Sequence, residues 1–119
     1  MTAELPPATD LSQCSYLQVA TTLANEEEAL SLAHALVERR LAACVQVVGP
    51  VTSVYRWQGA IETSREWQCV MKTAGVRYAE LVQTIIELHP YEVPELIASE
   101  IVAGSPAYLA WISQETKTL

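Results

Sequence analysis

Apolar residues along the chain switch between a period of two and a period of three to four, which predicts strands alternating with helices. Residues 15–22 alternate and end in β-branched side chains, so they form the first predicted strand. A helix is predicted next, because apolar residues recur there at helical spacing and would face a core: Ala29, Ala33, Leu36, Val37 and Leu41.

Both ends of this helix carry capping signals. Asn25 is placed to accept a hydrogen bond from the first turn, with Glu28 three residues on, as in a capping box. The acidic run 26–28 suits the positive end of the helix dipole, and Arg39 and Arg40 suit the negative end. The acidic run is therefore interpreted as a helix terminus and not as a metal-binding patch.

A long hairpin is predicted in the middle of the chain. Residues 42–48 and 51–57 form one strand interrupted by Gly49-Pro50, a pair that predicts a bend or a bulge. Gln58-Gly59 then turns the chain, and residues 61–73 run back as an equally long strand.

The returning strand and the hairpin tip have distinct expected surroundings. Alternation places Trp67, Cys69 and Met71 on one face, with Gln68, Val70 and Lys72 on the other. Such a hairpin is expected to project beyond the domain, and it requires a partner to cover the aromatic residues near its tip: Tyr55, Trp57 and Trp67.

The remaining elements complete an α+β fold. Residues 76–89 form a second predicted helix that stops before Pro90, and its apolar face contains Tyr78, Leu81, Val82, Ile85 and Leu88. Residues 95–102 are predicted as a fourth strand. Ser105 and Pro106 begin a short last helix, packed down by Tyr108, Leu109, Trp111 and Ile112. This order predicts a ferredoxin-like βαββαβ sandwich with a long hairpin between its second and third strands and a short C-terminal helix.

Composition narrows the class of protein. The chain has 119 residues, 50% hydrophobic and 18% charged, which suits one packed domain over residues 15–119. Residues 1–14 lack periodicity and are expected to be a flexible N-terminal extension. A formal net charge of -7 argues against nucleic acid and anionic membrane partners, and no apolar run is long enough for a membrane helix.

Cysteine usage and the N-terminus predict a cytoplasmic protein. No basic segment followed by an apolar stretch of signal-peptide length begins the sequence. Cys14, Cys44 and Cys69 are widely spaced, so neither a disulfide framework nor a zinc site within one chain is expected. Cys44 and Cys69 are interpreted as small core residues. Because the sequence lacks a nucleophile elbow, a phosphate loop and a dinucleotide fingerprint, no enzyme activity is predicted.

His89 is the strongest candidate for a functional side chain. It ends the second predicted helix and lies near Tyr91, Glu92 and Glu95, and imidazole beside carboxylates suits copper, nickel or zinc. The structural alternative is that His89 caps the last carbonyls of its helix while the carboxylates face water. His34 lies off the apolar stripe and is interpreted as an exposed helix residue.

Several motifs together resemble the CutA family of divalent-cation tolerance proteins. They extend in order over about residues 16–112: Thr21-Thr22, Arg40-Leu-Ala-Ala-Cys-Val45, Ser53-Val-Tyr-Arg-Trp57, Lys72-Thr73, His89-Pro-Tyr-Glu-Val-Pro-Glu95 and Tyr108-Leu-Ala-Trp-Ile112. The resemblance implies a ferredoxin-like fold assembled as a homotrimer, a cytoplasmic location and a role connected with copper and other divalent metal ions. It also implies architectural kinship with PII-type signalling trimers.

The resemblance further implies metal ligands. The histidine and glutamate that the family offers in its His-Pro-Tyr region match His89 and Glu95, whereas Thr21 stands where some members have a cysteine. Without a soft sulfur ligand, a site of imidazole and carboxylate suits Cu(II) or zinc better than Cu(I). No organic cofactor is expected.

Two hypotheses follow for the function. In the first, the protein is a trimeric metal-binding tolerance factor in which His89 is the primary ligand and Glu95 assists. In the second, it is a PII-like regulatory trimer that binds a small molecule or an unidentified protein partner in the clefts between subunits, with Trp57 and Tyr91 as candidate contacts. An enzyme is a third possibility, which rests only on the functional breadth of the ferredoxin-like fold.

Overall fold

Four antiparallel strands form one sheet in the order β2-β3-β1-β4, in a computed structural model that describes residues 10–118. The elements occur in the predicted sequence: β1 (Tyr16–Leu23), α1 (Glu26–Glu38), β2 (Cys44–Trp57), β3 (Ala60–Ala74), a 3-10 turn (Gly75–Arg77), α2 (Tyr78–Leu88), β4 (Ile97–Glu100) and α3 (Pro106–Glu115). The predicted α+β fold is thereby confirmed, and its order is that of a ferredoxin-like sandwich.

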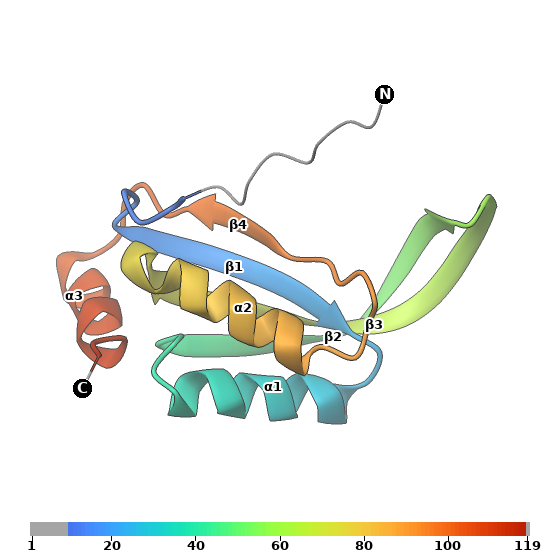
Figure 1. The fold of residues 1–119 in the computed structure, drawn as a ribbon, viewed down its shortest axis with the longest axis horizontal. Coiled ribbons are helices and arrows are strands. Elements are labelled where there is room, and N and C mark those ends of the chain that lie inside the picture. The colour runs from blue at the N-terminus through green and yellow to red at the C-terminus, as the bar shows by residue number, and fades with distance from the viewer. Residues whose placement is uncertain (1–9, 119) are drawn as a thin grey trace.

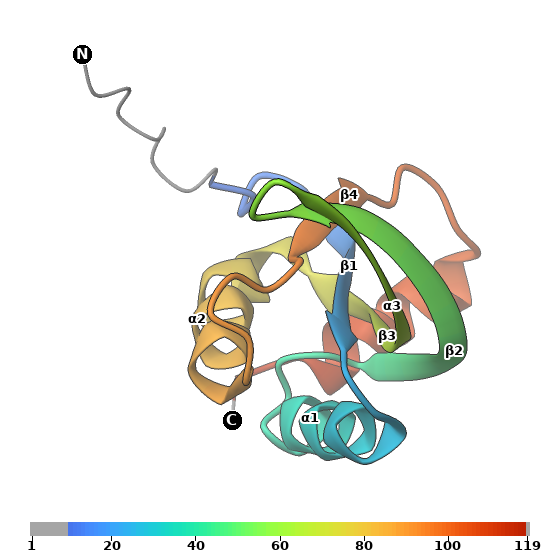
Figure 2. The ribbon, with the colours of Figure 1, turned by 90° about the vertical axis from the view of Figure 1, so that its right-hand side faces the viewer.

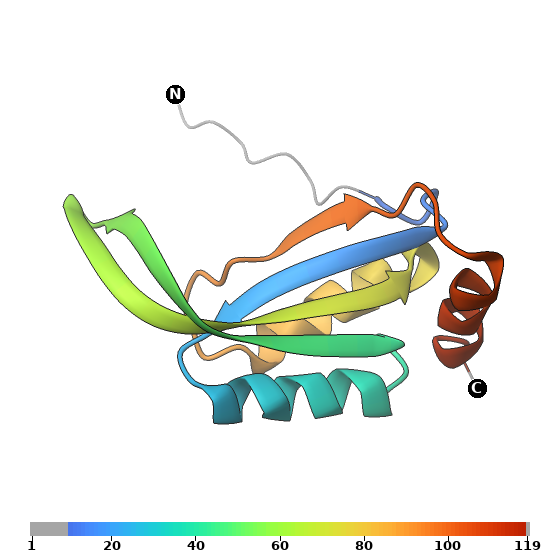
Figure 3. The ribbon, with the colours of Figure 1, turned by 180° about the vertical axis from the view of Figure 1, so that it is seen from behind.

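The molecule has two layers. Helices α1 and α2 lie on the same side of the sheet, as Figures 1 and 2 show, and α3 lies at the end of the sheet away from the hairpin (Figure 1). Figure 3 shows the other side of the sheet, which no helix of residues 10–118 covers. One face of the sheet therefore packs into the core and the other is available to solvent or to a partner.

The core lies between the sheet and the two helices. On β1, Leu17 and Val19 are buried while Tyr16, Gln18 and Ala20 are only half-buried, as expected for a strand with one core face. They pack in one cluster with buried residues of β3, α1 and α2: Cys69, Met71, Ala29, Leu32, Leu36, Leu81 and Ile85. The predicted inward face of β3 is thus confirmed, with Trp67 packed against the same cluster.

Helix α1 begins with the predicted cap, but its C-terminal end differs from the prediction. The Asn25 side chain accepts a hydrogen bond from the Glu28 backbone N–H at 2.8 Å, which confirms the cap. The helix ends at Glu38, with no basic residue in its last turn. Arg40 has a left-handed backbone, with φ 59°, and its guanidinium instead donates to the carbonyls of Gln114 and Lys117 at the end of α3. The predicted role at the end of α1 is therefore wrong for Arg40, whereas Arg39 is the C-cap residue of α1.

The hairpin of β2 and β3 extends beyond the rest of the sheet (Figures 1 and 3). Its strand register shifts between Val48 and Val51, so the bulge predicted at Gly49-Pro50 is confirmed. The turn consists of Gln58 and Gly59, both with positive φ (48° and 81°), between the last pair Trp57 and Ala60. Two left-handed residues match the twist of the strands, which suits a tight hairpin.

Several predicted contacts are wrong in detail. Val37 and Leu88 are exposed, and Leu32 takes the buried place on α1 that the predicted stripe had omitted. On α3, Ile112 is buried but Tyr108 and Trp111 are exposed, with ring centroids 5.5 Å apart. The fourth strand is only four residues long.

The N-terminal segment joins the domain earlier than predicted. Residues 1–9 of the predicted extension lie outside the described residues. In the remainder, the Cys14 N–H donates to the Leu11 carbonyl at 3.0 Å, and both side chains pack against the core cluster. Residues 11–14 therefore form a turn that belongs to the packed domain.

Candidate functional site

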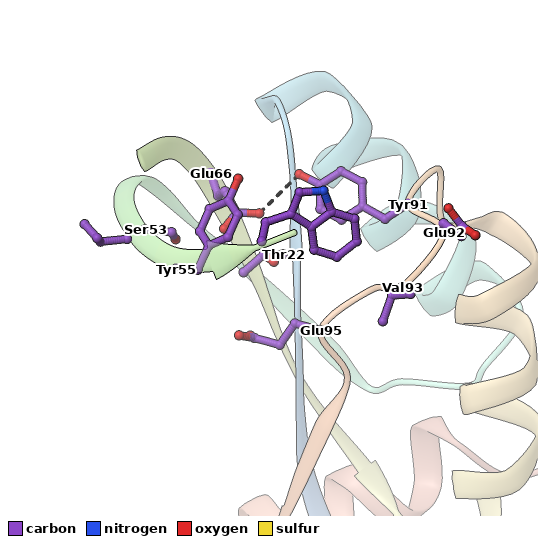
Figure 4. A pocket seen from close by; sticks show the side chains of 10 residues that line it. Thr22, Ser53, Tyr55, Glu66, Tyr91, Glu92, Val93 and Glu95 are labelled. Carbon is purple, nitrogen blue, oxygen red and sulfur yellow. Dashed lines mark hydrogen bonds between the residues drawn. The ribbon is translucent and has the colours of Figure 1, made fainter. Parts of the chain in front are cut away.

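A cavity of about 580 Å³ opens where the hairpin leaves the sheet. Its walls come from the end of β1, from residues 53–57 of β2, from β3, and from the loop at 91–95 that follows α2. Figure 4 shows these segments converging, and they contribute three aromatic and three acidic side chains: Tyr55, Trp57, Tyr91, Glu66, Glu92 and Glu95. None of the described residues that line the cavity is Lys, Arg or His.

The strand pairing explains why these hairpin residues share a wall. Tyr55 and Trp57 are two residues apart on β2 and point to the same side. Glu66 is paired with Val51, which lies on that side as well, because it precedes Tyr55 by four residues. The Ser64 hydroxyl donates to the Tyr55 hydroxyl at 3.3 Å and links the two strands across this face.

His89 lies behind this cavity and does not line it. Its side chain is 7% exposed, and one ring nitrogen, Nε2, lies 2.8 Å from the Thr22 carbonyl oxygen at the end of β1. The other, Nδ1, accepts a hydrogen bond from the Tyr91 backbone N–H at 3.1 Å. Since Nδ1 is the acceptor, the neutral ring donates from Nε2, and both nitrogens are engaged.

This geometry gives His89 a structural role that the sequence had not indicated. Its ring does not cap the carbonyls of α2, as the structural alternative proposed, but joins the end of β1 to the loop after α2. Burial lowers the pKa of His89 below its ordinary value, although the Thr22 carbonyl and the carboxylates of Glu28 and Glu66 oppose that shift. The neutral form therefore suits this position.

Tyr91 connects the buried histidine to the cavity. Its ring centroid lies 4.8 Å from that of His89, and its hydroxyl donates to Glu66 Oε2 at 3.1 Å (Figure 4). Burial, reinforced by the negative charge of Glu66, raises the pKa of Tyr91 to about 12. The phenol therefore stays protonated and orients the Glu66 carboxylate at the cavity wall.

Thr21 holds Glu95 in place through its backbone. The Thr21 side chain is buried, and its hydroxyl donates to the Glu95 carbonyl at 2.6 Å. Thr21 thus fastens the loop that carries a cavity carboxylate.

Replacing Thr21 with valine keeps the side-chain shape but removes this hydrogen bond. We expect the free energy of unfolding to fall by about 1–2 kcal/mol, because the Glu95 carbonyl loses its partner in a partly buried place. Urea denaturation at fixed protein concentration measures the change. Thr52→Val, on an exposed position of β2, is the matched control and should change stability by less than about 0.5 kcal/mol. Equal values for the two variants would remove this role from Thr21.

Potential metal ligands are only partly gathered in one chain. Within residues 10–118, no three His, Cys, Asp or Glu side chains come together in a group that could hold a metal ion. Figure 4 shows the carboxylates of Glu92 and Glu95 pointing in different directions. Burial raises the pKa of the Cys69 thiol to about 11, which disfavours the thiolate that soft metals bind. The described residues of one chain therefore do not form a complete metal site.

A comparison with protein-family models identifies the family. The model described as CutA1 divalent ion tolerance protein matches residues 17–115, which include every element from β1 to α3 except the first residue of β1. The chain belongs to the CutA1 divalent ion tolerance family. The resemblance found in the sequence is thereby confirmed.

Individual CutA proteins agree in sequence and in fold. The divalent-cation tolerance protein CutA of Thermus thermophilus is 43% identical over 98 residues, which cover 82% of this chain and 95% of that protein. Mouse protein CutA is 41% identical over 98 residues, but they cover only 55% of its length. The crystal structure of CutA from Xylella fastidiosa has a TM-score of 0.84 and 38% identity, and it covers 87% of this chain and 99% of that chain.

Relatives are found in more than one compartment. One from Arabidopsis thaliana is named as chloroplastic, and a solved structure from Archaeoglobus fulgidus is named as a periplasmic CutA. Within residues 10–118, no helix has the length and apolar character needed to cross a membrane. The predicted cytoplasmic location therefore stays a prediction.

The structure brings together three of the four residues singled out from the sequence. Glu95, Trp57 and Tyr91 line one cavity, whereas His89 lies buried behind it. Sequence reasoning missed Glu66, which occupies a strand otherwise rich in polar residues. The available signal was that Glu66 lies two residues before Gln68, and so on the same face of the strand, close to the predicted bulge. Only the pairing of β3 with β2 and the hydrogen bond from Tyr91 place it in the cavity wall.

Proposed function

We propose that this protein is a homotrimer that binds divalent cations, Cu(II) among them, at the cavity beside the hairpin. The observation that carries the proposal is the chemistry of the cavity wall, which offers three carboxylates and no basic side chain. Such a wall creates a negative potential and concentrates cations in a partly enclosed space. Membership of the divalent ion tolerance family gives this charge a biological context.

The donor set supports some metals more than others. Carboxylate oxygens are hard donors, and a buried Cys69 with a raised pKa gives no thiolate for Cu(I). Of the metals that the family resemblance implies, Cu(II) and zinc are therefore favoured over Cu(I). Glu92 and Glu95 are exposed at the cavity and would approach the cation first, with Glu66 held behind them by Tyr91.

A neighbouring subunit would complete the ligand shell. The hairpin projects beyond the sheet, and its most exposed apolar residues, Val54 (66%) and Ile61 (68%), have no cover within residues 10–118. Strands β2 and β4 are the two edges of the sheet and can pair with another chain. Repeating one contact between unlike surfaces can close a ring, and the family resemblance supports a ring of three subunits.

Metal binding by His89 stays a prediction, and it requires one ring nitrogen to lose its present hydrogen bond. Its Nδ1 must release the Tyr91 N–H before it can bind a metal, because Nε2 donates to Thr22. Electron paramagnetic resonance of bound Cu(II) distinguishes the two modes. Nitrogen hyperfine splitting that is absent from His89→Gln would assign His89 as a ligand, and a spectrum without nitrogen splitting would assign oxygen ligands alone.

Calorimetric titration of Cu(II) tests the proposal. Glu95→Gln removes one charge with little change of shape, so we expect the Kd to rise about tenfold. Glu38→Gln, which neutralises an exposed carboxylate at the far end of α1, should leave the Kd within about twofold of the wild-type value. Equal affinities for wild type and Glu95→Gln would show that copper binds elsewhere.

A further inference from the structure

The cavity is larger than a bare metal ion requires. Its volume of about 580 Å³ falls within the range of about 300–1,000 Å³ that is typical of pockets for small organic molecules. The space is enclosed by four separate segments of the chain, as Figure 4 shows, so it can surround a ligand on several sides.

The wall carries aromatic faces beside its carboxylates. Tyr55 and Trp57 share one side of β2, and the large Trp57 side chain is 47% exposed. Tyr91 contributes a third ring from the opposite segment. Aromatic faces attract organic cations such as ammonium groups, and Trp does so most strongly.

The carboxylates are distributed around the cavity and do not form one cluster. Glu92 and Glu95 point in different directions (Figure 4), and no three acidic or other metal-ligating side chains of residues 10–118 make a compact group. Tyr91 fixes one oxygen of Glu66 by its hydrogen bond, which leaves the second oxygen as an acceptor. Separated acceptors suit a ligand with separated positive groups.

We propose that this cavity binds an organic ammonium ion of the alkyl-diamine class. One ammonium group lies against the rings of Trp57 and Tyr55 and donates hydrogen bonds to Glu66, and the second reaches Glu95. The inference rests on the proposed function only in treating this cavity as the cation site. It adds a class of ligand, organic ammonium ions, that the aromatic wall can select. A site for a metal ion alone would not require these aromatic rings.

Other classes of ligand fit the wall less well. A nucleotide or another phosphate ester would meet three glutamates without a basic side chain to offset its charge. A neutral apolar ligand would leave those carboxylates partly desolvated without a counter-charge. The ammonium group is the chemical feature that satisfies both the rings and the acids.

Calorimetry with 1,4-diaminobutane and its neutral analogue 1,4-butanediol tests the proposal on the wild-type protein. We expect the diamine to bind with a Kd of about 1 mM or tighter, and the diol to give no binding heat at about 10 mM. Equal binding of the two compounds would overturn the proposal, because charge would then not be recognised. Absence of diamine binding at about 10 mM would also overturn it.

Variants separate this ligand from the metal. Trp57→Leu should weaken diamine binding by about threefold to tenfold and Trp57→Phe by less, while neither changes the Kd for Cu(II) beyond about twofold. Glu95→Gln should weaken both ligands. If Cu(II) binds but the diamine does not, the inference fails and the proposed function stands. If the diamine binds but Cu(II) does not, the proposed function fails and the ammonium site stands. An unchanged diamine Kd in Trp57→Leu would exclude the aromatic contact.

Discussion

Replacing Val54 and Ile61 together with lysine is expected to convert the proposed trimer into monomers. Each of these residues is about two-thirds exposed on the hairpin of the isolated chain (66% and 68%). In the proposed assembly the hairpin packs against the neighbouring subunit, so two lysines would place unpaired charges in a desolvated contact. Light scattering should find about three times 13.1 kDa for wild type and about 13.1 kDa for the variant.

The matched control lies on the helical layer. Ile86→Lys replaces an apolar residue that is also exposed, at 56%, but belongs to α2 and not to the hairpin. It should leave the mass of the trimer unchanged. A wild-type monomer at micromolar concentration would refute the trimer, and a hairpin variant that stays trimeric would place the contact elsewhere.

Replacing His89 with alanine is expected to lower the free energy of unfolding by about 3 kcal/mol or more, because two polar partners and a buried ring are lost together. The Thr22 carbonyl and the Tyr91 N–H would each lose their hydrogen bond to the ring. His34→Ala, on the exposed side of α1, is the matched control, with an expected change below about 0.5 kcal/mol. Urea denaturation at one protein concentration compares them, and similar losses for both would contradict the buried linkage.

The same histidine predicts a pH dependence of stability. Burial lowers the pKa of His89 below its ordinary 6.5, so the folded chain binds the proton less readily than the unfolded chain. Its contribution is therefore complete above about pH 6.5 and is lost as the pH falls through the folded pKa. Wild type should lose more stability than His89→Ala between about pH 8 and pH 5.5, so the two should converge on acidification. Parallel pH profiles would show that the buried ring does not titrate in this way.

The parts of the fold that could be predicted are those that depend on residues close together in the sequence. Gly49-Pro50 interrupts regular pairing and Gln58-Gly59 tolerates left-handed backbone, so the bulge and the turn follow from the residues at those positions. Asn25 and Ser105 cap their helices as expected, because a cap depends on neighbours within three residues. The order of strands and helices along the chain follows from the period of the apolar residues.

Contacts between distant segments explain what could not be predicted. Arg40 leaves α1 to bond the carbonyls of Gln114 and Lys117, more than 70 residues away. The backbone N–H of His89 donates to Ile85 in its own helix, but its ring is paired with Thr22, so the environment of the ring depends on how α2 packs beside β1. Glu66 acquires its place in the cavity only through the register of the hairpin. Apart from Glu66, the aromatic and acidic residues of the site could be nominated from the sequence, but the division between cavity wall and buried support could not.

Anomalous scattering from a crystal of the wild-type protein soaked with Cu(II) shows directly where the metal binds. We expect a copper peak inside the cavity, at coordinating distance from the carboxylate of Glu95 or Glu92, with a neighbouring subunit closing the site. A copper peak only at an exposed residue such as His34, with none in the cavity, would contradict it.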